Sequence, residues 1–157
     1  VNKKIIENPE TVATAIRIGN PASWEFAEKA LLESSGQIDA IDEGGLVKAG
    51  LHLLNDDIDR CHRIVQDTPT AEGNYWHAIL HRREPDYFNS KYWYRRVGEH
   101  PVFSQLRQEF HEWNPCEFVD WCESSSTGNG VKSVSWLEDV QAKEMKHLLN
   151  YLRTDAG

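Results

Sequence analysis

The chain has 157 residues, of which 39% are apolar and 27% charged, so it is long enough to bury a core and differs from disordered compositions. The formal net charge of −8 argues against a general nucleic-acid or anionic-membrane binder, since such proteins carry a basic face. No apolar run approaches the roughly 20 residues of a membrane span, and no signal-peptide pattern opens the chain. We therefore expect one domain over residues 1–157 that binds neither nucleic acid nor membrane. Because the chain begins with Val1 rather than Met, we expect its natural start to have been lost.

The cysteine pattern indicates a reducing compartment. Cys61, Cys116 and Cys122 include no CxxC pair and form no disulfide framework. Cysteines of this kind usually pack in the core as small apolar side chains. We expect three core thiols in a cytoplasmic protein.

Helix start and stop signals recur along the first half of the chain. Asn-Pro pairs begin predicted helices at 9–19 and 21–34, each followed by a glycine that ends it. The acidic, glycine-bearing segment 37–45 is predicted to be a loop or a weak turn. Apolar residues at helical spacing then predict helices at 46–54 and 58–65, joined as a hairpin through an Asn/Asp turn.

Helix start and stop signals also recur along the second half of the chain. Predicted helices cover approximately residues 71–84, 87–97, 101–113, 115–122 and 137–152. Ser135 and Glu138 have the spacing of a capping box, which predicts that the last helix begins there. No segment alternates polar and apolar residues over the length of a strand. The fold class is therefore predicted to be all-α, with seven or eight helices packed as αα-hairpins.

Two segments resemble a known repeat class. LLNDDIDRCHRIVQ and DYFNSKYWYRRVG, within residues 46–98, look like half-repeats of the Sel1 and tetratricopeptide class, with Cys61 and Ser90 at the small-residue positions. The resemblance implies stacked αα-hairpins and a scaffolding or partner-binding role. No 34–38-residue period runs along the chain, so a regular solenoid is not expected. Residues 75–98 also resemble a small helical family with the signature YWHAI-HRRE-DY-KYW-RRVG. No activity can be carried over from this family.

Three polar residues in this stretch could form a metal or acid–base site. On one helix His77 and His81 are four residues apart, and Glu84 follows three residues later on the same face. Two imidazoles and a carboxylate at this spacing could bind zinc, or iron as a 2-His-1-carboxylate set. The same residues are the candidate catalytic acid–base groups. His52 and His62 could add a ligand from the preceding hairpin, whereas the alternative is a solvated helix face without metal.

Basic and aromatic residues are concentrated between residues 75 and 98. The candidate ligand-binding residues are Arg82, Arg83, Lys91, Arg95, Arg96, Tyr75, Tyr87 and Trp93. Arginine forks suit carboxylate and phosphate groups, and aromatic faces can stack on a ring. This predicts recognition of a small anionic ligand or an acidic protein segment. The alternative is that these arginines pair with carboxylates of neighbouring helices while the aromatic residues fill the core.

Two functions therefore remain open from the sequence. One is a binding domain whose Arg/His/aromatic face recognises an anionic small molecule or acidic segment. The other is a small metal-assisted or acid–base enzyme that uses His77, His81 and Glu84, with the arginines holding an anionic substrate. A purely structural domain without a site is the third possibility.

Overall fold

The computed structural model describes residues 35–40, 42–55 and 57–154, and within them all the regular secondary structure is α-helix. The prediction of an all-α fold is confirmed. The helices expected at 9–19 and 21–34 lie outside the described residues.

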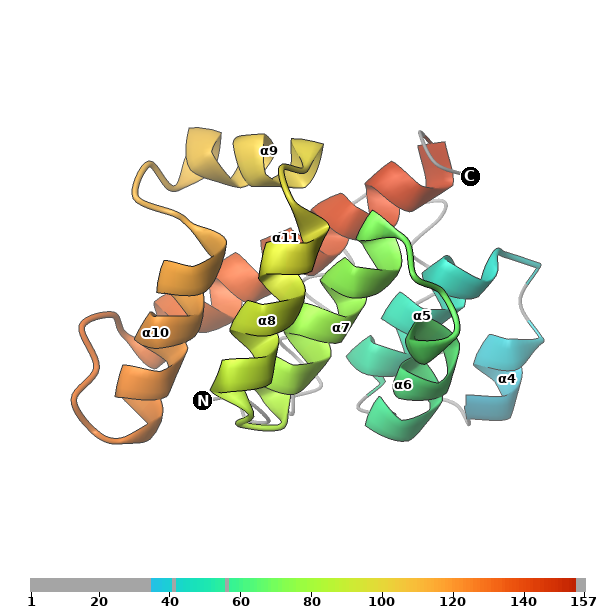
Figure 1. The fold of residues 1–157 in the computed structure, drawn as a ribbon, viewed down its shortest axis with the longest axis horizontal. Coiled ribbons are helices and arrows are strands. Elements are labelled where there is room, and N and C mark those ends of the chain that lie inside the picture. Colours follow the sequence, from blue (N-terminus) through green and yellow to red (C-terminus); the bar gives the residue numbers. More distant parts are fainter. Residues whose placement is uncertain (1–34, 41, 56, 155–157) are drawn as a thin grey trace.

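Eight helices make up the described part of the chain. They are α4 (Ser35–Asp39), α5 (Gly45–Leu54), α6 (Ile58–Gln66), α7 (Ala71–Arg83), α8 (Tyr87–Val97), α9 (Pro101–Glu109), α10 (Pro115–Ser126) and α11 (Val134–Thr154). In Figure 1, α10, α8, α7 and α6 follow one another across the view, α5 lies behind α6, and the long α11 crosses behind α8 and α7. None of these helices combines the length and the apolar character needed to cross a lipid bilayer.

Side-chain caps fix three of the predicted helix starts. Thr70 accepts a hydrogen bond from the Gly73 amide at 3.1 Å, and Asp86 accepts one from the Asn89 amide at 3.4 Å. Asn114 caps α10 by accepting bonds from two amides of its first turn. Each cap satisfies an amide that has no partner within its own helix, so these starts can be recognised from short-range sequence.

Two local predictions were wrong. The segment 37–45 is not wholly a loop, because α4 extends to Asp39. The capping box at Ser135 is also wrong, since that residue lies inside α11. The hydroxyl of Ser133 instead accepts a hydrogen bond from the Trp136 amide at 3.2 Å, so the cap sits two residues earlier.

The core is centred on α7, where every residue from 75 to 80 is buried. Helices pack closely at Gly50, where an added Cβ would lie only 2.5 Å from the Trp76 ring and 2.9 Å from Leu149. Glycine is therefore required there by the close approach of α5 to α7 and α11. All three cysteines are free; Cys61 and Cys122 are buried as predicted, whereas Cys116 is only partly buried.

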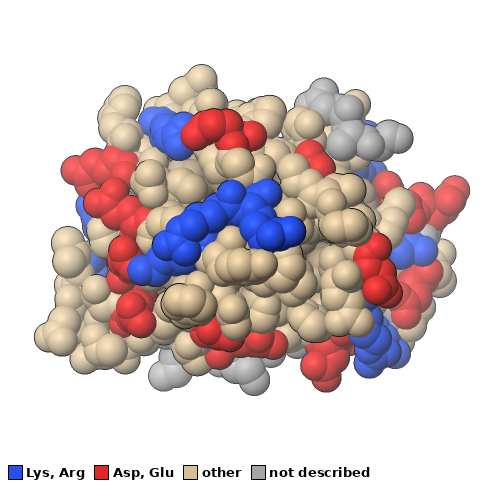
Figure 2. Space-filling view, viewed as in Figure 1, with Lys and Arg blue, Asp and Glu red and all other residues tan. Residues whose placement is uncertain are grey.

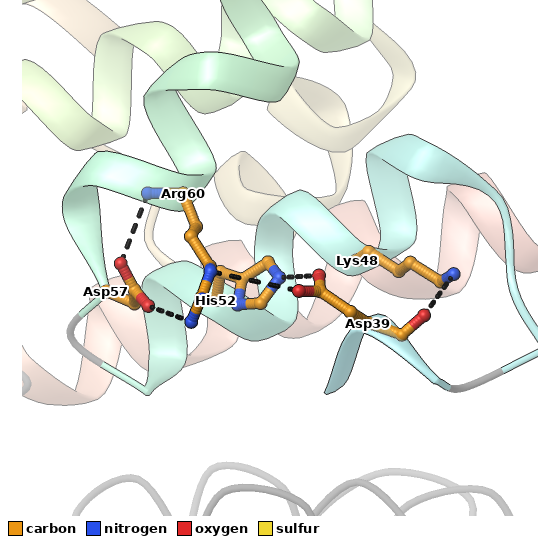
Figure 3. Close-up of polar contacts among 5 residues, drawn as sticks. All are labelled: Asp39, Lys48, His52, Asp57 and Arg60. Carbon is orange, nitrogen blue, oxygen red and sulfur yellow. Dashed lines mark hydrogen bonds and ion pairs between the residues drawn. The ribbon is translucent and has the colours of Figure 1, made fainter. Parts of the chain in front are cut away.

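Asp39 links α4 to the rest of the fold (Figure 3). One of its carboxylate oxygens lies 2.7 Å from Nε2 of the buried His52, and the other lies 3.8 Å from Nε of Arg60. Its backbone carbonyl accepts a hydrogen bond from Lys48 at 2.8 Å. Arg60 also pairs with Asp57 at 3.3 Å. His52 is therefore engaged by a structural carboxylate.

Candidate metal centre

Three histidines from two helices converge beside the α6–α7 packing surface. His62 comes from α6, whereas His77 and His81 occupy consecutive turns of α7. One ligand atom from each residue can be chosen so that all three atoms lie within 4.8 Å of one another. The spacing on α7 therefore aligns two imidazoles as predicted, and the packing of α6 adds the third.

Glu84 lies behind this cluster rather than within it. Its carboxylate is 3.2 Å from Nδ1 of His81, and the Asp86 carboxylate is 3.9 Å from the same atom. A carboxylate on one imidazole nitrogen fixes the ring orientation and leaves the other nitrogen for a further partner. Nδ1 of His81 makes no hydrogen bond within the described residues, so Glu84 is an ion-pair neighbour of this ring, and the third imidazole of the cluster is His62.

Trp93 of α8 covers one side of the cluster. Its indole stacks on the His77 ring with centroids 3.9 Å apart and planes 7° apart, and the His77 and His81 rings are stacked at 5.0 Å. The Arg96 guanidinium lies 5.7 Å from the centre of the Trp93 ring. A stack of planar groups thus runs from the exposed surface of α8 to the histidines.

The electrostatic environment favours the neutral form of the two α7 imidazoles, His77 and His81. Burial lowers the pKa of His77 to about 4, with further lowering by His81 and His62. Burial also lowers the pKa of His81, although the Glu84 and Asp86 carboxylates act in the opposite direction. Nδ1 of His77 is buried without a hydrogen-bond partner in the described part of the chain. Neutral imidazole is the form that ligates metals.

Arg82 is fully buried in a hydrogen-bonded network of protein side chains. Its guanidinium donates hydrogen bonds to Glu144 at 2.9 Å, to Gln141 at 2.8 Å and to the Tyr94 hydroxyl at 2.7 Å. Tyr94 and Tyr75 both donate to the other oxygen of Glu144, at 2.6 and 3.0 Å. Burial alone would lower the pKa of Arg82, but Glu144 raises it above its ordinary value. The network ties α7 and α8 to α11.

Two other predicted ligand-binding residues also point inward. Arg83 is fully buried, and Nη1 of its guanidinium donates to the Leu53 carbonyl on α5. Tyr87 is buried with 9% of its surface exposed. The alternative of pairing with a carboxylate of another helix therefore describes Arg82, whose partner Glu144 lies on α11, whereas Arg83 donates to a backbone carbonyl of α5.

The remaining basic candidates lie along α8. Figure 2 shows Lys and Arg side chains in a band across the centre of this face, over α8. Lys91 pairs with Asp120 at 2.5 Å, whereas Arg95 and Arg96 are exposed and have no carboxylate partner among the described residues. Beside them Phe88 is 78% exposed and Tyr92 is 42% exposed. We call Tyr92, Arg95, Arg96 and Phe88 the α8 face.

Comparisons with known proteins match only a fraction of the chain. No family model matches, and no solved structure matches. Threonine synthase from Halalkalibacterium halodurans is 53% identical over 49 residues, which is 31% of this chain and 14% of that enzyme. Threonine synthases from Bacillus sp. and Synechocystis sp. are 51% and 48% identical over 49 and 44 residues, covering 14% and 12% of those enzymes. The chain thus spans about one-seventh of the length of the relatives it matches.

Proposed function

We propose that this domain binds a divalent metal ion, with preference for zinc, through His62, His77 and His81. The convergence of three imidazoles, with ligand atoms within 4.8 Å of one another, is the observation that carries the proposal. Glu84 supports it as a carboxylate 3.2 Å from Nδ1 of His81, where it would orient the ring once a metal ion is bound to the other nitrogen. The short threonine synthase matches form no part of the proposal.

The donor set favours zinc over a non-haem iron site. Imidazole suits zinc, copper, iron and nickel, but the non-haem iron facial triad also needs a coordinating carboxylate, and Glu84 lies against His81 rather than in the cluster. Three protein ligands leave a fourth position of a tetrahedral ion for water or an exchangeable ligand, as in catalytic zinc sites. The proposed activity is therefore metal-assisted, with an anionic ligand or water at that position.

Metal content and affinity test this proposal directly. Protein purified without a tag is stripped with chelator, reloaded with Zn²⁺ or Co²⁺, and measured by elemental analysis and titration calorimetry. We expect one ion per chain, and a visible Co²⁺ spectrum of a four-coordinate site. His62→Ala is the most informative variant because His62 is only partly buried, so its loss leaves the core intact.

Matched variants separate coordination from adventitious binding. His147→Ala removes an imidazole that lies 3.0 Å from Glu109 on another part of the surface, and it should bind metal as the wild type does. His62→Ala and His81→Ala should each lower affinity at least 100-fold, and Glu84→Gln about 10- to 100-fold through lost orientation. Equal affinity of His62→Ala and His147→Ala would refute the site.

We also propose a second function, recognition of an acidic protein segment by the α8 face. Two exposed arginines without carboxylate partners stand beside exposed Phe88 and Tyr92, on a protein whose overall charge is −8. Arg96 stacks over Tyr92, which pre-organises its guanidinium for a carboxylate. Charge complementarity therefore favours an acidic segment with apolar side chains.

Binding of a labelled peptide of alternating glutamate and leucine tests this second function. Arg95→Glu/Arg96→Glu should weaken binding at least tenfold, and added salt should weaken wild-type binding. Arg63→Glu is the control, because it reverses an exposed charge on α6. If Arg63→Glu weakens binding as much as the double variant does, the attraction is a property of overall charge and the α8 face is not the site.

A further inference from the structure

A second cluster of aromatic residues encloses a cation at the α10–α11 end of the domain. Nζ of Lys132 lies 5.1 Å from the centre of the Trp121 ring and 5.0 Å from that of Trp136. The two indoles meet at 70°, and Phe110 closes on Trp136 at 80°. The Glu112 carboxylate is 3.0 Å from the same Nζ. Aromatic walls at steep angles with a carboxylate at the rim form a cage for a positive charge.

We propose that Trp121, Trp136 and Glu112 form a binding site for a methylated ammonium group, and that Lys132 is its internal competitor. A methylated ammonium carries the same charge as lysine but is more weakly hydrated, so it gains more from the aromatic faces. Such a group occurs both in choline-like small molecules and in methylated lysine side chains. The cage is separate from the histidine cluster, because its aromatic residues come from α10, α11 and the segment after α9.

The position of Lys132 makes its displacement inexpensive. It belongs to the connection between α10 and α11, where neighbouring Val131 is 72% exposed and Gly128 has a φ of +85°. Its partner Glu112 is 74% exposed, and exposed ion pairs contribute little to stability. Trp121 and Trp136, in contrast, pack on the core and hold their rings in place. The two tryptophan rings are thus held by the core, whereas Lys132 belongs to the exposed connection between α10 and α11.

The test measures the affinity of the full chain for choline and for its uncharged isostere 3,3-dimethyl-1-butanol, by NMR of the tryptophan indole protons. Lys132→Ala should bind choline about tenfold more tightly than the wild type, because the internal competitor is gone. The isostere should bind neither protein. Adding Trp136→Leu to Lys132→Ala should abolish choline binding, and Glu112→Gln should weaken it.

The outcomes also distinguish the two sources of the group. A trimethyllysine peptide that binds Lys132→Ala at least tenfold more tightly than choline does would assign the cage to a protein partner. Equal affinity would assign it to a small molecule. Two outcomes would overturn the proposal. One is that wild type and Lys132→Ala bind choline with the same affinity, and the other is that choline and its uncharged isostere bind equally. Lys146→Ala, a charge deletion on α11, controls for the loss of one positive charge.

Discussion

Acid should destabilise this protein through His77 in particular. Because burial lowers the pKa of His77 in the folded state to about 4, against an ordinary value of 6.5, the unfolded chain binds more protons between these two pH values. The stabilisation is therefore complete above about pH 6.5 and is lost as pH falls towards 4. At 1.36 kcal/mol per pKa unit, lowering the pH from 7.5 to 4.5 should cost about 2.5 kcal/mol through this group.

The measurement is urea unfolding of metal-free protein across this pH range. His77→Phe is the comparison, because phenylalanine keeps a ring against Trp93 and cannot be protonated. Carboxylates titrate in both proteins, so the difference between the two pH profiles isolates the histidine. Wild type should lose about 2.5 kcal/mol more than the variant. Parallel profiles would refute the buried, neutral state of His77.

Two further predictions concern packing and the buried network. Gly50→Ala should lower the free energy of unfolding by about 1–3 kcal/mol, because its Cβ would overlap Trp76. Gly45→Ala in the same helix is the control: its Cβ would meet only Ile64 at 3.8 Å, so the change should be neutral or stabilising. Equal effects of the two variants in urea unfolding would contradict the close approach of the helices at Gly50. Glu144→Gln should cost about 3–5 kcal/mol by leaving the buried Arg82 charge uncompensated. In a double-mutant cycle, Arg82→Met should cost much less in the Glu144→Leu background than alone, and simple additivity would contradict the pairing.

The helices could be predicted because their signals are local. Caps such as Asn114 act on amides two or three residues away, so their pattern is visible in sequence. The cap of α11 was misplaced because Ser133 and Ser135 offer the same hydroxyl two residues apart. The resemblance of residues 46–98 to Sel1 and tetratricopeptide hairpins stays a prediction.

The site could be predicted only in part, because it depends on how helices pack. The alignment of His77 and His81 follows from helical spacing, and the structure brings both into one cluster. His62 was considered only as an added ligand, since its approach depends on the packing of α6 against α7. Arg82 was assigned to a ligand because its carboxylate partner, Glu144, is 62 residues away along the chain. A sequence that mixes charged and aromatic residues, as residues 75–98 do, does not show whether an arginine lies in a buried hydrogen-bonded network or on an exposed binding surface.

The separation of Arg82 and Glu144 also bears on how the protein matures during synthesis. At about 5–20 residues per second, a ribosome needs roughly 3–12 s to extend the chain from one partner to the other over these 62 residues. During that interval the α7–α8 hairpin holds a guanidinium without the carboxylate that compensates it in the finished fold. Docking of α11 is therefore the step that makes burial of this charge favourable. The nascent chain should remain sensitive to protease until α11 has been synthesised.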